Sequence, residues 1–134
     1  MTVKAIHHCS IVVTDLERAR RFYRDVLGLQ ETPVPSTFDF PVAWFQFGDQ
    51  QIHLLPRGHA DPPSPRHFAL WVDDAQAWRQ CLKEKGIAIQ ETTPIPGADR
   101  FFIQDPDGNL IELIEWSAPW PQADPNARRL PSLE

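Results

Sequence analysis

A repeat with a period of 59 residues is the feature that most constrains how this chain folds. His67 follows His8 by 59 residues, and Glu112 follows His53 by the same interval. The same offset aligns two apolar segments, Ile52-His53-Leu54-Leu55 and Ile111-Glu112-Leu113-Ile114. A fixed period indicates a repeated supersecondary unit, and two copies are too few for a solenoid, so they must close on each other. The sequence therefore predicts two equivalent modules.

Composition excludes several classes of function. The chain has 134 residues, which suits one ordinary domain, and no apolar run approaches the roughly 20 residues that a membrane helix requires. Its net charge of -5 offers little attraction for phosphate backbones, so nucleic acid is not expected as a partner. The N-terminus lacks the apolar core of a signal peptide and only two cysteines occur, so we expect a cytoplasmic protein without membrane attachment.

The first module reads as a strand, a helix and three strands. β-branched residues at 5–13 predict a strand, and Thr14-Asp15-Leu16-Glu17 matches a capping box that begins a helix. Apolar residues at helical spacing continue to Gly28, where a glycine readily ends a helix. Strands are predicted at 29–33, 42–47 and 51–55, with a tight turn at 48–50 between the last two.

The second module repeats this order. We expect a strand at 66–72, a helix from 74 to 85 ending at Gly86, and strands near 87–91, 100–104 and 109–115. The boundaries that follow are 1–55 for the first βαβββ module, 56–65 for a proline-rich connector, 66–116 for the second module and 117–134 for an irregular tail.

Four side chains able to bind a metal fall on one face of the predicted strands. Alternate residues of a strand share a face, and the apolar set is expected to pack against the helices. This logic places His8, His53, His67 and Glu112 on the opposite face, at the centres of strands. A buried, unpaired carboxylate costs several kcal/mol, and a divalent cation would supply the missing charge. Imidazole and carboxylate ligands suit Zn, Fe, Ni, Mn or Co.

Several segments together resemble the vicinal oxygen chelate superfamily, which includes glyoxalase I, extradiol dioxygenases, fosfomycin-resistance thiol transferases and bleomycin-resistance proteins. The resemblance covers about residues 4–116 and is carried by the paired βαβββ pattern, Ile6-His7-His8, residues 22–29, 67–74 and 105–113. It implies an α+β fold with a cupped mixed sheet and helices outside, and a divalent metal held by His8, His53, His67 and Glu112. Glyoxalase-like members usually carry Glu where this chain has His53, which puts a two-glutamate proton shuttle in doubt.

The resemblance implies a small substrate that chelates the metal through adjacent oxygens, with Glu112 and His53 as candidate catalytic groups. Either His53 binds the metal, or it stands back and acts as a base or hydrogen-bond partner. Residues expected to line the cavity and contact the substrate share the ligand face: Arg100, Trp71, Trp44, Gln104 and Phe102. A guanidinium grips carboxylates and phosphonates well, although a solvated loop arginine explains Arg100 equally well.

Three functions remain open at this point. The first is a metal-dependent lyase, isomerase or dioxygenase of the glyoxalase-like family, and the second is a fosfomycin-type thiol transferase. The third is a metal-free protein that sequesters a ligand, as bleomycin-resistance proteins do. Because each module supplies two of the four ligands, the site forms either within one chain or between module one and module two of a partner, and we expect a homodimer.

Overall fold

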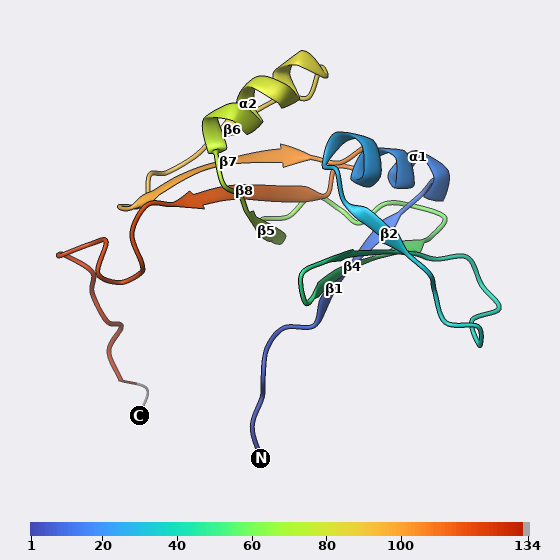
Figure 1. The fold of residues 1–134 in the computed structure, drawn as a ribbon, viewed down its shortest axis with the longest axis horizontal. Coiled ribbons are helices and arrows are strands. Elements are labelled where there is room, and N and C mark those ends of the chain that lie inside the picture. The colour runs from blue at the N-terminus through green and yellow to red at the C-terminus, as the bar shows by residue number, and fades with distance from the viewer. Residues whose placement is uncertain (133–134) are drawn as a thin grey trace. The chain divides into compact units, whose positions relative to one another are not determined.

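The computed structural model of the protein describes residues 1–132 and contains two modules with the same order of elements (Figure 1). The first consists of β1 (His8–Val13), α1 (Leu16–Arg21), the π-helical turn η1 (Phe22–Val26), β2 (Gln30–Thr32), β3 (Ala43–Phe47) and β4 (Gln50–Pro56). The second consists of β5 (His67–Trp71), α2 (Ala75–Glu84), β6 (Gln90–Glu91), β7 (Ala98–Gln104) and β8 (Leu110–Trp116). The α+β class and the repeated βαβββ order are confirmed.

The strands form two four-stranded sheets with matching orders, β1-β4-β3-β2 and β5-β8-β7-β6. In the first sheet β1 runs parallel to β4, whereas β3 is antiparallel to both β2 and β4, so this sheet is mixed. The structure therefore has two open sheets, whereas the sequence suggested one cupped sheet. In each order the first and last strands of the module, which carry the candidate ligands, are neighbours.

The chain divides into two compact units whose boundaries do not follow the order of the sequence. The first unit comprises Met1–Phe68 and Gln104–Ile111, and the second comprises Ala69–Ile103 and the residues from Glu112 onward. The turn between β7 and β8 belongs to the first unit because it bonds to β1 and the first helix. The hydroxyl of buried Tyr23 donates to Asp105 at 2.8 Å, and Asn109 donates to the carbonyl of Val12 at 2.9 Å.

Both helices begin at an aspartate and end before a glycine. Asp15 and Asp74 are the N-caps, since their carboxylates accept from the backbone N–H of Arg18 and Ala77 respectively. The predicted capping box is therefore wrong by one residue. The Thr14 hydroxyl instead bonds to Asp107, in the turn between β7 and β8. Because the Thr14 hydroxyl is already bonded to Asp107, the carboxylate of the next residue, Asp15, caps the helix.

Gly28 and Gly86 adopt positive φ angles of 70° and 77°, as the prediction of helix ends requires. The first helix spans one residue more between cap and glycine than the second, because its last turn is π-helical. The N–H of Leu27 bonds to the carbonyl of Phe22, which lies five residues earlier. A π-helical turn accommodates one inserted residue without ending the helix.

Burial follows the predicted alternation in β1 and β5, whereas the centre of β4 is buried on both faces. In β1, Ile11 and Val13 are buried while His8 and Ser10 are exposed, and in β4 the side chains of Ile52 and Leu54 are fully buried. The first helix packs on β4, and Arg79 of α2 places its guanidinium 4.7 Å from the ring centroid of Phe101 on β7. Within residues 1–132, no helix combines the length and apolar character needed to cross a membrane.

Candidate functional site

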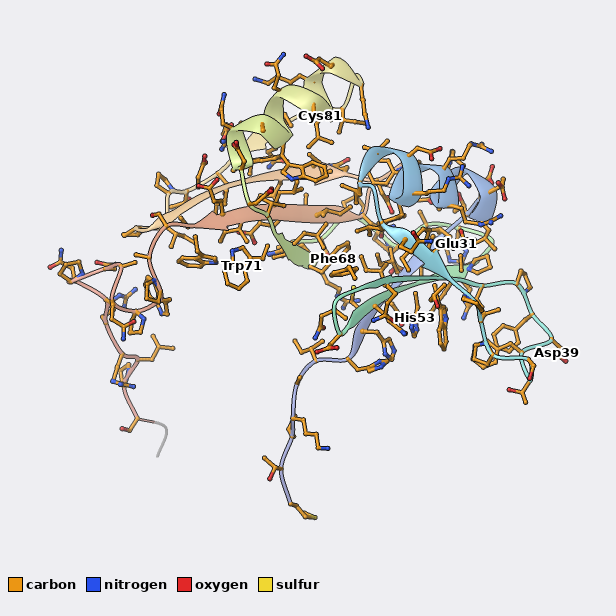
Figure 2. The ribbon with its side chains drawn as sticks, viewed as in Figure 1. Glu31, Asp39, His53, Phe68, Trp71 and Cys81 are labelled. Carbon is orange, nitrogen blue, oxygen red and sulfur yellow. The ribbon has the colours of Figure 1, made fainter. Side chains whose placement is uncertain are left out.

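His53 occupies the centre of the first unit's candidate site. It lies in the middle of β4, where its register partners are Trp44 on β3 and Ser10 on β1. Its ring stacks on Trp44 with a centroid distance of 3.9 Å and an interplanar angle of 1°, and on His8 at 3.9 Å and 17°. Figure 2 shows His53 on the side of the sheet away from α1. The pairing of β1 with β4 therefore brings two of the four candidate ligands into direct contact.

A chain of hydrogen bonds between side-chain amides ends at one ring nitrogen of His53. His53 Nε2 lies 2.8 Å from Gln51 Oε1, and Gln51 donates through Nε2 to Gln46 Oε1 at 2.6 Å. Gln46 in turn donates to the backbone carbonyl of Gly48 at 2.7 Å. Burial, reinforced by the nearby imidazoles of His8 and His7, lowers the pKa of His53 to about 4. The ring is consequently neutral near pH 7, which is the form that binds metals or accepts protons.

The other two histidines of the candidate set are exposed. His8 Nδ1 lies 3.0 Å from His7 Nδ1, and His67 donates through Nδ1 to the carbonyl of Pro65 at 2.9 Å. His67 also lines a cavity of about 190 Å³ in the first compact unit, together with Ser10 and Val12. His8 is not among the residues that line this cavity, and the expected ligand face shared by His8 and His67 stays a prediction.

Glu112 lies buried in β8 of the second unit and is paired with a cation from the chain itself. Arg100 on β7 donates through Nη1 to Glu112 Oε1 at 3.0 Å, and the side chains are 15% and 8% exposed. The guanidinium also donates to the carbonyl of Thr93 and lies 5.9 Å from the ring centroid of Phe102. Arg100 is therefore a strand residue rather than a solvated loop residue. It supplies the positive charge that the buried carboxylate needs.

The remaining residues expected to contact substrate have different surroundings. Trp44 is half-buried against His53, and Phe102 is buried beside Arg100. Gln104 is exposed at the end of β7. Trp71 is 79% exposed and projects from β5 on the side opposite α2 (Figure 2), where it lines an apolar hollow with Trp116 and Trp120. Trp44 and Arg100 thus contact candidate ligands, His53 and Glu112 respectively.

The donor types fit a divalent metal, since three imidazoles and a carboxylate form a usual ligand set for Zn, Ni or Fe. Among residues 1–132, no three His, Cys, Asp or Glu side chains are grouped so that they hold an ion. The three histidines lie in the first compact unit and Glu112 lies in the second.

Two arginines that the local sequence pattern did not single out occupy equivalent places in the repeat. Arg79 of α2 is buried and binds Asp99 at 2.7 Å and Glu91 at 2.7 Å. Arg20, which is 59 residues earlier, binds Glu31 of β2 at 2.8 Å and Glu17 at 2.6 Å. Each arginine therefore ties a module's helix to its outermost strand. Their shared offset was the available signal.

Comparison with known proteins places the chain in a family. The family model described as the Glyoxalase/Bleomycin resistance protein/Dioxygenase superfamily matches residues 5–113. The chain belongs to this superfamily.

Individual relatives span nearly the whole chain. A lactoylglutathione lyase of Haemophilus influenzae is 30% identical over 123 residues, covering 82% of this chain and 91% of the relative. The uncharacterised protein YwkD of Bacillus subtilis is 32% identical over 129 residues, covering 86% and 99%. The crystal structure of a putative glyoxalase family protein from Bacillus anthracis superposes with a TM-score of 0.80 at 29% identity, covering 87% and 98%.

Proposed function

We propose that the protein is a divalent-metal-dependent enzyme of the glyoxalase-like type, acting on a small substrate that chelates the metal through adjacent oxygens. The observation that carries the proposal is the set of metal-binding side chains, His8, His53, His67 and Glu112, at matching places of the repeat. All four stand on the first or last strand of a module. The similarity to lactoylglutathione lyases supports lyase or isomerase chemistry.

The metal would be held by these four side chains, or by three of them if His53 does not coordinate it. When bound, it would act as a Lewis acid that stabilises negative charge developing on substrate oxygens. Its identity among Zn, Ni, Mn, Fe and Co is not specified by the donors. His53, held neutral between Trp44 and His8, is suited to accept a proton or donate a lone pair. The Arg100 guanidinium donates to Glu112 Oε1 and limits the rotation of the carboxylate.

We further propose that each site forms between two copies of the chain, with His8 and His53 from one and His67 and Glu112 from the other. The exposure of β5 supports this arrangement. This strand presents both His67 and Trp71 to solvent, and a partner would cover these side chains. The result is a homodimer with two equivalent sites.

Metal content per chain tests the enzyme proposal. The protein is purified without a histidine tag, incubated separately with Zn, Ni, Mn, Fe and Co, desalted and analysed by elemental mass spectrometry. We expect about one ion per chain for at least one metal, and a loss of most bound metal in the Glu112→Gln variant. An absence of stoichiometric binding by all five metals contradicts the proposal.

Mixing two defective variants tests whether the site is shared. His8→Ala removes a ligand from the first module and His67→Ala removes one from the second. In a shared arrangement, a heterodimer of the two variants rebuilds one intact site and leaves the other doubly defective. Co-expression is therefore expected to restore metal that neither variant binds alone. A mixture that stays metal-free, or a monomer that binds one ion by light scattering, contradicts sharing.

A second candidate function is a metal-free ligand-binding protein. The observation that favours it is the Arg100–Glu112 ion pair, because Glu112 has a cationic partner without any metal. This candidate predicts no stoichiometric metal and tight binding of an organic ligand to the metal-free chain. A fosfomycin-type thiol transferase requires metal and would be recognised by thiol consumption with an epoxide substrate. Oxygen uptake with catechols would identify a dioxygenase. A cytoplasmic location stays a prediction.

A further inference from the structure

The amide side chains of Gln46 and Gln51 form a directed hydrogen-bond chain that ends on His53. We infer that these two residues fix the neutral His53 ring with its proton on Nε2, so that Nδ1 is the nitrogen that binds the metal or accepts a proton. The inference rests on the proposed function for the role of His53. Gln46 and Gln51 are positioning residues in this scheme, because they act through the imidazole.

The direction of the chain is set at its far end by a group that only accepts. The carbonyl of Gly48 has no hydrogen to donate, so the Gln46 group 2.7 Å away must be the amide nitrogen. Gln46 therefore turns its oxygen toward Gln51, which must present its own nitrogen at 2.6 Å. Gln51 then turns its oxygen toward His53 Nε2 at 2.8 Å, and this nitrogen must carry a proton.

Reversing the chain would create a direct conflict. If His53 Nε2 were the unprotonated nitrogen, Gln51 would have to offer its NH₂ group to it and turn its oxygen toward Gln46. Gln46 would then rotate as well, and its oxygen would face the Gly48 carbonyl. Two acceptors at that separation repel each other and lose a hydrogen bond. The backbone carbonyl thus selects one of the two neutral tautomers.

The stacked rings restrict the chemistry of His53 to the edges of the imidazole. Trp44 covers one face and His8 the other, both with centroid distances of 3.9 Å. One edge is occupied by the Gln51 contact. Among residues 1–132, His53 Nδ1 makes no hydrogen bond, so its lone pair is available to a metal or a proton. A hydrogen bond to one ring nitrogen commonly orients the other for metal binding.

Nuclear magnetic resonance of the metal-free full chain tests the inference. Long-range ¹H–¹⁵N correlation spectra of ¹⁵N-histidine-labelled protein distinguish the two neutral tautomers, and the His53→Gln variant assigns the His53 signals. We expect the Nε2–H tautomer of His53 to dominate by at least about tenfold, which corresponds to roughly 1.4 kcal/mol. A dominant Nδ1–H tautomer in the unmodified chain overturns the inference.

Variants of the two glutamines show whether they are responsible. Gln51→Leu and Gln46→Leu are expected to reduce the tautomer preference several-fold, the first because it removes the acceptor and the second because Gln51 is then free to rotate. Gln51→Glu is expected to keep the preference, since a carboxylate only accepts. Gln80→Leu, on the exposed face of α2, is the matched control and should change nothing. A preference that survives Gln51→Leu overturns the inference.

Cadmium as the added metal separates this inference from the proposed function. If ¹¹³Cd binds, its scalar coupling is expected at His53 Nδ1 or at neither nitrogen of His53, and coupling at Nε2 overturns the inference. If no cadmium binds while the Nε2–H tautomer persists in the unmodified chain, the tautomer assignment is upheld and the metal-dependent function is contradicted. The two proposals therefore fail by different observations.

Discussion

His53 and Glu112 occupy the same position of the repeat and are both buried. Different partners compensate for the burial of these two polar side chains. Both residues are 6% exposed. His53 is kept neutral between two rings and bonded to an amide, whereas Glu112 forms an ion pair with the guanidinium of Arg100. The repeat thus preserves where a metal-binding group stands on the strand. The neighbours on adjacent strands differ, since His53 contacts aromatic rings and Glu112 contacts a guanidinium.

The largest expected change in the free energy of unfolding comes from breaking the Arg100–Glu112 ion pair. Arg100→Met leaves the Glu112 carboxylate buried without its guanidinium, and removing one partner of a buried ion pair destabilises proteins by about 3–5 kcal/mol. We expect a loss in that range for the metal-free chain. Urea unfolding followed by circular dichroism measures it.

The double variant Arg100→Met, Glu112→Gln is the control for this experiment. It removes both charges, so most of the stability lost in Arg100→Met is expected to return. Equal losses in the single and double variants would show that the ion pair is not the cause. Metal added to Arg100→Met should also restore stability if the ion binds Glu112, because a ligand that binds only the folded state stabilises it.

The lowered pKa of His53 predicts that the stability of the fold depends on pH. The folded chain holds the pKa of His53 at about 4, below its ordinary value of 6.5. Between these two values the unfolded state binds more protons than the folded state, so stability rises with pH. The contribution of His53 is therefore complete above pH 6.5 and is lost as the pH falls toward 4. A shift of this size corresponds to at most about 3 kcal/mol.

Urea unfolding of the metal-free chain between pH 4 and pH 7 measures this slope, and His53→Gln is the control because it cannot titrate. We expect the difference in stability between the two proteins to change by up to about 3 kcal/mol across the window. Glu31 and Asp99, whose pKa values are lowered by Arg20 and Arg79, titrate equally in both proteins and cancel. Parallel pH profiles would contradict the origin assigned to the slope.

The sequence predicted the features that depend on local pattern. The 59-residue period located both modules, and the alternation of apolar residues placed Ile52 and Leu54 in the core opposite His53. The helix-ending glycines Gly28 and Gly86 were also found correctly, because a positive φ angle leaves few alternatives to glycine. These signals are carried by neighbouring residues and do not depend on distant contacts.

What the sequence did not predict depends on contacts between distant residues. The Thr14 hydroxyl bonds to Asp107, 93 residues away, and this contact shifts the cap to Asp15. Arg100 was assigned to the substrate because nothing in the local pattern indicates its pairing with Glu112 on the neighbouring strand. The amide chain from Gly48 to His53 likewise appears only when the register of β3 and β4 is known.

The smallest expected effects come from the arginines that tie each helix to its outer strand, and they compare the two modules directly. Each arginine binds two carboxylates, but the Arg79 side chain is 10% exposed whereas the Arg20 side chain is 32% exposed. Arg79→Met is expected to cost about 2 kcal/mol, since charged hydrogen bonds are lost at a nearly buried guanidinium. Arg20→Met should cost about 0.5 kcal/mol, because exposed ion pairs contribute little. Thermal unfolding at low and high salt measures both, and high salt should weaken the Arg20 contribution more. Equal costs for the two variants would mean that burial does not distinguish these two ties, and that the second module gains no extra stability from the deeper position of its arginine.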